Sequence, residues 1–212
     1  VVAILDTGVS HGHEVFASAP KNPRLSRADV QKFLDENDMH CESDVPSVGA
    51  STLYYSEKIP YQFDYGDHDA DGTPTEGGEH GTHVAATAAG NDGVKENFSG
   101  VAPEAQIVNM KVFMESGGAS YDDILAALED CMVLGVDSVN LSLGSNCGFI
   151  DYEDQDEWTM NLINVFNRTG ESGICMAVAV GNAYSAAYNN HYGGTALASN
   201  PDYGLVSEPS TY

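Results

Sequence analysis

Basic residues are scarce in this chain of 212 residues, where eight Lys and Arg stand against 32 Asp and Glu and the net charge is −24. A surface of this sign repels phosphate groups, so we expect no nucleic acid partner and no attraction to an anionic membrane. The same acidity suits a secreted protein, or one that binds calcium through carboxylates, and it also favours plain solubility.

Cysteine pairs and long apolar runs are also missing. The four cysteines, Cys41, Cys131, Cys147 and Cys175, form no Cys-x-x-Cys pair, so we expect mostly free thiols, with one disulfide left open. No apolar run reaches about 18 residues, which predicts no membrane insertion within this chain. No signal peptide opens the sequence, and its first residues already have the pattern of a strand, so we expect a piece of a larger protein.

What is present fits a globular α/β protein, with 42% hydrophobic and 19% charged residues. Continuous apolar runs predict buried strands at 1–5, 106–113, 136–143 and 174–180. Capping residues and apolar stripes predict helices at 26–37, 120–135 and 157–167, and a short Ala-rich helix after residue 80. This alternation predicts a parallel sheet with helices on both faces.

Two stretches depart from the alternation. Residues 18–75 are mostly polar and charged, and we interpret them as an insertion between the motif at Asp6 and the motif at His80, which are described below. Residues 183–212 are rich in Tyr, Asn, Gly, Ser and Pro with little periodicity, which indicates a loop-rich segment. Residues 1–212 are interpreted as one unit that contains both stretches.

A histidine stands at the start of the Ala-rich helix, in the run Gly-Glu-His-Gly-Thr-His-Val-Ala-Ala from Gly78 to Ala86. Small residues let this helix pack closely on a sheet, while His80 at its mouth stays reachable for acid/base chemistry. His80 and His83 are also spaced as metal ligands on one helix face, and either residue alone is compatible with a packed structural role.

An aspartate follows the first apolar run in the sequence Asp6-Thr7-Gly8. The carboxyl ends of parallel strands are where sites form, so Asp6 is predicted at the same edge as His80. An apolar run followed by Asp-Thr-Gly also marks aspartic peptidases, in which two such aspartates share a proton. That alternative needs a homodimer here, because no second Asp-Thr-Gly occurs.

The runs at 80–85 (His-Gly-Thr-His-Val-Ala) and 100–103 (Gly-Val-Ala-Pro) resemble the subtilisin-like serine peptidases. Residues 26–33 and 58–65 resemble the same region of cell-envelope proteinases of the lactocepin group. The resemblance covers nearly the whole chain. It implies that residues 1–212 are the N-terminal portion of a catalytic domain with an incomplete subtilisin-like fold. It also implies a serine endopeptidase acting on extended proteins or peptides, and a secreted or cell-surface location.

By this resemblance Asp6 orients the His80 imidazole, His80 takes the proton of a serine, and Asn182 stabilises the tetrahedral intermediate. An amide just behind a glycine at a strand end, as in Gly181-Asn182, can donate to an oxyanion, although such a pair alone also marks a turn. The resemblance further implies substrate-backbone contacts, formed by Ser116, Gly117, Gly118, Ser142, Leu143 and Gly144. Ordinary loops and strand ends are the alternative for both segments.

No serine has the sequence context of the family's nucleophile. The remaining candidates in the last segment all lack it: Ser185, Ser199, Ser207 and Ser210. In lactocepin-like relatives a protease-associated domain separates the oxyanion asparagine from the serine, so we expect 183–212 to lead into such a domain and the serine to follow it. The chain alone is then expected to be inactive. A degenerate peptidase kept as a binding module is the alternative, and a structural fragment is another.

Metal binding is open. Residues 67–72 (Asp-His-Asp-Ala-Asp-Gly) have the carboxylate spacing of the first half of a calcium loop. The twelfth position of such a loop is Gly78 instead of an acidic residue, which favours a solvated acidic loop. The family's usual strong calcium site is also in doubt, because Val15 stands where an acidic residue is common. We expect no required cofactor and leave calcium open.

Overall fold

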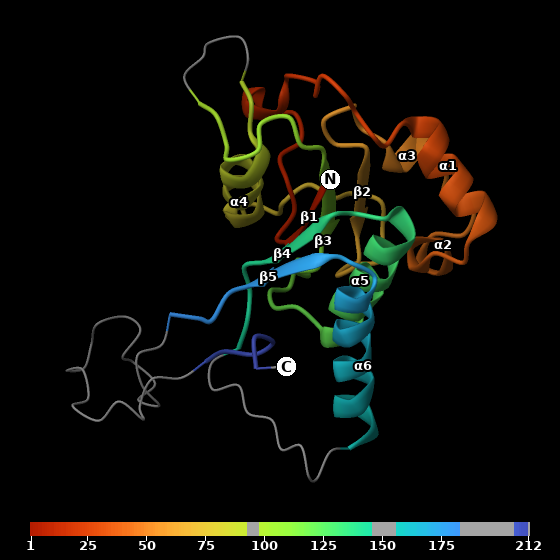
Figure 1. The fold of residues 1–212 in the computed structure, drawn as a ribbon, viewed down its shortest axis with the longest axis vertical. Coiled ribbons are helices and arrows are strands. Elements are labelled where there is room, and N and C mark those ends of the chain that lie inside the picture. Colours follow the sequence, from red (N-terminus) through yellow and green to blue (C-terminus); the bar gives the residue numbers. More distant parts are fainter. Residues whose placement is uncertain (93–97, 146–155, 183–205, 212) are drawn as a thin grey trace, which may run out of the picture.

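Five parallel strands form the centre of the protein in the computed structural model, which describes residues 1–92, 98–145, 156–182 and 206–211 (Figure 1). The strands lie in the order β2-β3-β1-β4-β5. Their bounds are β1 Val2–Asp6, β2 Tyr61–Asp64, β3 Ile107–Lys111, β4 Ser138–Leu141 and β5 Cys175–Val178. All the pairings between these strands are parallel, which confirms the predicted parallel α/β sheet.

Strand β1 has a neighbour on each side and is buried on both faces, as its continuous apolar run predicts. Ala3 and Leu5 belong to the larger hydrophobic core, which they share with the helix α5 (Tyr121–Leu134) and the helix α6 (Glu157–Glu171). Ile4 points the other way, into a smaller core with the helix α4 (His80–Ala89). Because alternate residues enter different cores, helices must cover both faces of the sheet.

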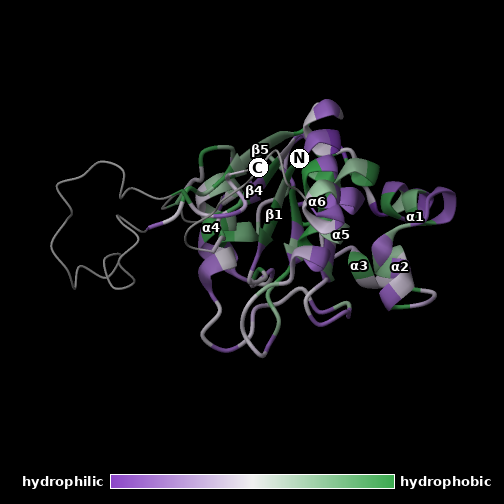
Figure 2. Ribbon diagram, turned by 90° about the horizontal axis from the view of Figure 1, so that it is seen from below, coloured by the Kyte–Doolittle hydropathy of each residue, from purple (hydrophilic) through white to green (hydrophobic). Residues whose placement is uncertain are grey.

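The figures agree with this layering. Figure 2 shows α4 on one side of the strands and α5 and α6 on the other, with apolar colours concentrated on the strands between them. Helix α4 approaches the sheet through its smallest residues, since Gly81, Ala85 and Ala89 are the buried ones. Helix α5 begins at the N-cap Ser120, whose side chain accepts from the N–H of Asp122, and ends at a left-handed Gly135 with φ 63°.

The predicted insertion, 18–75, contains the three helices α1 (Arg27–Glu36), α2 (His40–Asp44) and α3 (Ala50–Leu53). Helix α1 confirms the expected helix and its capping box between Ser26 and Asp29. The helices α2 and α3 and the strand β2 were not predicted. Since β2 pairs with β3, the stretch supplies an edge strand of the core sheet as well as surface helices.

A buried aspartate fastens this region to the core. Asp130 of α5 is 1% exposed and accepts hydrogen bonds from the backbone of His40 (2.9 Å) and Cys41 (3.3 Å) at the start of α2. It also accepts from the hydroxyl of Tyr65 at 2.8 Å, just beyond β2. Burial raises the pKa of Asp130, and these donors act against that rise. One side chain thus joins α2, α5 and the end of β2.

Several boundaries differ from the expectations. The strand expected at 174–180 is shorter, Cys175–Val178, and α6 continues to Glu171, four residues past the expected end at 167. Cys41, Cys131 and Cys175 are free, and Cys147 lies outside the described residues. A search of the described residues finds no helix with the length and apolar character to cross a membrane. A short 3-10 helix, η1 (Glu14–Phe16), follows β1.

Candidate active site

Asp6 and His80 meet at the carboxyl edge of the sheet. Asp6 is the last residue of β1, is 1% exposed, and places its Oδ1 2.7 Å from Nδ1 of His80, the first residue of α4. The His80 side chain is 57% exposed, so a buried carboxylate holds an imidazole whose other nitrogen is left for chemistry in solvent. The N–H of Thr7 donates to the same Oδ1 at 2.7 Å and fixes the carboxylate.

The two motifs are also locked together through their neighbours. The Thr7 hydroxyl donates to the carbonyl of Gly78 at 2.5 Å and accepts from the N–H of Gly81 at 2.9 Å. A Cβ on Gly81 would overlap the carbonyl oxygen of Gly8 and lie 3.1 Å from the Asp6 Cβ. Gly8 itself has φ +96° and no room for a Cβ beside the Gly72 carbonyl. Gly81 is therefore required for the close approach of Asp6 to α4, and Gly8 for the packing of residues 72–74 against the end of β1.

A cleft of about 670 Å³ opens beside His80. The predicted residues Ser142, Leu143, Gly144 and Asn182 line it. Thr7, Phe113, Ser207 and the strand end 179–181 line it too, and these were not assigned to the site from sequence. The structure thus brings Asp6, His80, Asn182 and the segment 142–144 to one place. Ser116, Gly117 and Gly118 are exposed and do not line the cleft, although Phe113, which begins their turn, does.

The end of the described chain closes one side of this cleft. The N–H of Ser207 donates to the Val180 carbonyl at 2.9 Å, and Glu208 exchanges two backbone hydrogen bonds of 3.0 Å with Ser145. Ser207 is 2% exposed and packs against Gly181, which leaves no room for a Cβ there. Ser207 and Ser210 therefore lie in a segment of turns and one isolated bridge, with no helix or regular strand. Ser185 and Ser199 lie outside the described residues.

Asn182 follows Gly181, which has φ +94°, shortly after the end of β5. The positive φ explains the glycine, since other residues rarely adopt this conformation. Asn182 is exposed, and it lines the same cleft as His80 although 102 residues separate the two in the sequence. An amide in this place can donate to an oxygen atom bound in the cleft.

The carboxylates of the acidic loop after β2, residues 67–72, accept hydrogen bonds from other groups of the protein. Asp69 accepts from the N–H of Asp71 at 2.7 Å, and Asp71 accepts from the N–H and hydroxyl of Thr73 at 3.0 and 2.6 Å. The hydroxyl of Thr73 is the main reason that the pKa of Asp71 is lowered. Asp67 accepts from Lys111 and from the backbone of Glu115. Over the described residues, no group of three or more His, Cys, Asp or Glu side chains is arranged to hold a metal.

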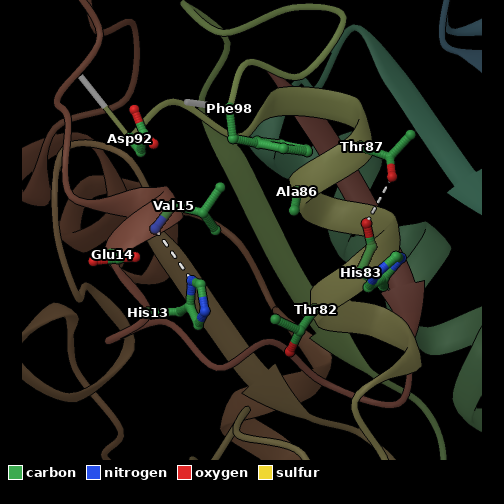
Figure 3. Close-up of a pocket in the computed structure, with 9 residues that line it drawn as sticks. All are labelled: His13, Glu14, Val15, Thr82, His83, Ala86, Thr87, Asp92 and Phe98. Atoms are coloured by element: carbon green, nitrogen blue, oxygen red, sulfur yellow. Dashed lines mark hydrogen bonds between the residues drawn. The ribbon is translucent and has the colours of Figure 1, made fainter. Parts of the chain in front are cut away.

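A second pocket, of about 330 Å³, lies between η1 and α4 (Figure 3). Neither Asp6 nor His80 lines it. His83 lines it with Thr82, Ala86 and Thr87 of the same helix. His83 is exposed, and its carbonyl accepts from the Thr87 hydroxyl at 2.9 Å. His80 uses Nδ1 for Asp6, which leaves Nε2 as the ring nitrogen available for chemistry.

Comparison with known proteins gives consistent matches. Residues 1–202 match the Peptidase_S8 family, described as the subtilase family. The chain is 33% identical to the PII-type proteinase of Lacticaseibacillus paracasei over 194 residues, which cover 86% of this chain and 9% of that protein. It is 29% identical to the C5a peptidase of Streptococcus pyogenes serotype M6 over 220 residues, which cover 99% of this chain and 17% of that protein.

Among solved structures, the S41 psychrophilic protease aligns with a TM-score of 0.54 and 25% identity, over 86% of this chain and 45% of that one. The fold of the described residues therefore corresponds to part of that protease. The chain spans well under a fifth of the length of the two curated relatives, so most of each relative has no counterpart in it.

Proposed function

Because the chain belongs to the subtilase family, we propose that it forms the Asp and His portion of a serine endopeptidase that cleaves peptide bonds in extended protein substrates. The observation that carries the proposal is the 2.7 Å contact between the buried Asp6 carboxylate and the exposed His80 imidazole. A carboxylate in this position holds the imidazole in one tautomer and stabilises its protonated form.

In the proposed reaction His80 takes the proton of a serine hydroxyl as the serine oxygen attacks the substrate carbonyl. The proton then passes to the leaving amine, and a water molecule repeats the sequence to release the acid product. Asn182 is proposed to donate to the carbonyl oxygen as it gains charge. Its place in the cleft that also contains His80 supports this role.

The serine is proposed to lie downstream of residue 212, beyond an inserted domain to which residues 183–212 lead. A cavity of about 380 Å³ beside His80 supports an approach from that part of the protein. It is lined by α4, by Asn140 and Ser142 of the β4 end, and by Val101, which is 89% exposed.

The substrate is proposed to run from the cleft wall at residues 142–144 to the turn at residues 116–118, and to pair with both through its backbone. The protein is proposed to act outside the cell or at its surface, without a required cofactor and with calcium left open. An aspartic peptidase is disfavoured, because its aspartate must share a proton with a second aspartate. In this protein Asp6 Oδ1 instead contacts His80 Nδ1 and accepts a hydrogen bond from the N–H of Thr7.

The test is labelling of the full-length protein by a serine-directed phosphonate. Stoichiometric labelling that is lost in His80→Ala supports the endopeptidase, together with hydrolysis of a peptide by the unlabelled protein. A full-length protein that binds peptides but is neither labelled nor active supports a degenerate binding module instead. Labelling of residues 1–212 alone would contradict the assignment of the serine to a downstream segment.

A further inference from the structure

The rim of the cleft is a narrow turn that has little packing of its own. Phe113 lines the cleft and forms an isolated bridge with Ala119. Between them the N–H of Met114 donates to Gly118 at 3.0 Å and the N–H of Gly117 donates to Met114 at 2.9 Å. Both glycines have positive φ, and no atom lies within 4 Å of a Cβ built on either. The tip of the turn therefore stands clear of the rest of the protein.

This tip presents backbone groups to solvent. Ser116, Gly117 and Gly118 are exposed, and within the part of the chain that the structure describes no hydrogen bond is donated by the N–H groups of Ser116 and Gly118. An extended peptide pairs more tightly with such groups when they keep a fixed position, since ordering them at each binding event costs free energy. Contacts between the base of the turn and the rest of the protein must therefore hold the tip in position.

A single carboxylate reaches the turn from the loop after β2. Asp67 Oδ2 accepts from the N–H of Glu115 at 2.8 Å, the residue just before the exposed tip. The preceding Gly66 presses against the same strand of the turn, since a Cβ on Gly66 would lie 2.8 Å from the carbonyl carbon of Phe113 and 2.9 Å from the nitrogen of Met114. One backbone contact and one charge-assisted hydrogen bond thus hold residues 113–115.

Asp67 is itself fixed by a buried ion pair. Lys111, the last residue of β3, donates through Nζ to Asp64 in a short contact and to Asp67 Oδ2 at 3.2 Å. The Asp64 carboxylate also accepts from the N–H of Asp67 at 3.0 Å. The side chains of Lys111 and Asp64 are 4% and 2% exposed, so this pair is shielded from screening by salt, whereas the Asp67 side chain is 29% exposed.

The same anchor is tied to the catalytic strand. Lys111 stands in register with Asp6 across the β1–β3 pair, and the N–H of Val112 donates to the Asp6 carbonyl at 2.9 Å. Backbone and carboxylate contacts therefore form a continuous series from Asp6 through Val112 and Glu115 to Asp67. It fixes the rim of the cleft relative to the catalytic aspartate.

We infer that Asp67 is a positioning residue, which holds the turn 113–119 so that residues 116–118 pair with the backbone of a long peptide substrate. The inference rests on the proposed endopeptidase function and adds a residue that acts on substrate length. Asp67 does not touch His80 or the reacting atoms. Its loss therefore affects only substrates that extend as far as the turn.

The experiment compares two peptides with one scissile bond, using the full-length enzyme. The long peptide has several residues on both sides of the bond, and the short one has a single blocked residue on one side and a chromogenic amide on the other. Asp67→Ala is expected to lower kcat/KM for the long peptide by about tenfold, mainly through KM, because a hydrogen bond to a charged group is lost. The short peptide is expected to change by less than about twofold.

Two further variants sharpen the result. Asp67→Asn keeps an oxygen that can accept from Glu115, so it is expected to recover most of the loss for the long peptide. Asp71→Ala is the matched control, because Asp71 is in the same loop and accepts only from Thr73 among its described hydrogen bonds. Amide hydrogen exchange at Glu115 is expected to be faster in Asp67→Ala and unchanged in Asp71→Ala.

The outcomes separate the two proposals. Equal losses for the long and short peptides would overturn the positioning role, since Asp67 would then act on the catalytic centre or on stability. An unchanged long peptide, or an unchanged exchange rate at Glu115, would overturn it as well. Cleavage of the short peptide by the unmodified enzyme tests the endopeptidase function by itself, and failure to cleave either peptide would remove both proposals.

Discussion

Gly81 offers the sharpest test of how the Asp6 and His80 pair is built. In Gly81→Ala the new Cβ would overlap the Gly8 carbonyl oxygen and sit 3.1 Å from the Cβ and Oδ1 of Asp6. These neighbours are backbone and a buried carboxylate, so they cannot swing aside as a flexible side chain can. Helix α4 must move away from the end of β1 instead.

The size of the effect follows from the overlap. Restoring ordinary contact requires α4 to retreat by about 1 Å, and a displacement of that size at a catalytic group costs about 10²-fold in rate. Overpacking of this kind costs about 1–3 kcal/mol of stability, against a gain of about 0.5–1 kcal/mol for replacing a helical glycine. We expect kcat of the full-length enzyme to fall by about 10²-fold, with a net loss of roughly 1–2 kcal/mol in the free energy of unfolding.

Gly170→Ala is the control, because Gly170 is also helical, lies in α6, and has no atom within 4 Å of the position that a Cβ would take. It is expected to be as stable as the parent or slightly more so, with unchanged kcat. Steady-state hydrolysis and thermal unfolding of both variants check this. A Gly81→Ala enzyme with parental kcat would refute the argument that this glycine sets the distance between Asp6 and His80.

Three further predictions concern titration and thiols. The hydrogen bond to Asp44 raises the pKa of His68 above 6.5. The stabilisation from this contact is therefore present below pH 6.5 and is lost as the pH rises through the raised pKa. The difference in Tm between the parent and His68→Gln should shrink over this range. Burial lowers the pKa of Lys58 from 10.5 to about 8, so the unfolded chain binds the Lys58 proton more tightly than the folded protein does. The free energy of unfolding should therefore rise with pH between these two values, and this rise should be absent in Lys58→Met. In a Cys147→Ser background, a thiol reagent should modify the exposed Cys175 of the native protein and leave Cys41 and Cys131 unmodified, because both are buried and burial raises the pKa of the Cys41 thiol to about 12.

The Asp6 and His80 arrangement was accessible from sequence because each residue is marked by its immediate neighbours. An apolar run before Asp6 and an Ala-rich helix after His80 each predict an element on their own. Parallel topology then sends both to the same edge, although 74 residues separate them. Local pattern and a general rule of sheet geometry predicted the shared edge, and the resemblance to the subtilisin-like peptidases implied the pairing of the two residues. The observed distance confirms their proximity.

The walls of the cleft were harder to predict. Ser207 enters it through one backbone hydrogen bond to Val180, and its neighbour Glu208 pairs with Ser145. Such pairings leave no trace in hydrophobic periodicity, because the segment 206–211 is neither a helix nor a regular strand. The edge strand β2 was missed for a related reason: it lies within a polar stretch, and its four residues are buried through pairing with β3 and packing against α3.

The acidic loop illustrates how one spacing can have two physical causes. Carboxylates at alternate positions suit calcium, yet the same alternation lets Asp69 and Asp71 accept from N–H groups two residues further on, as in the turns that aspartate favours. Asp67 departs from this local pattern, because its donors are 44 and 48 residues away in Lys111 and Glu115. The contact with the buried Lys111 at the end of β3 distinguishes Asp67 from the other carboxylates of the loop. This contact could not be predicted from sequence, because it depends on the pairing of β2 with β3.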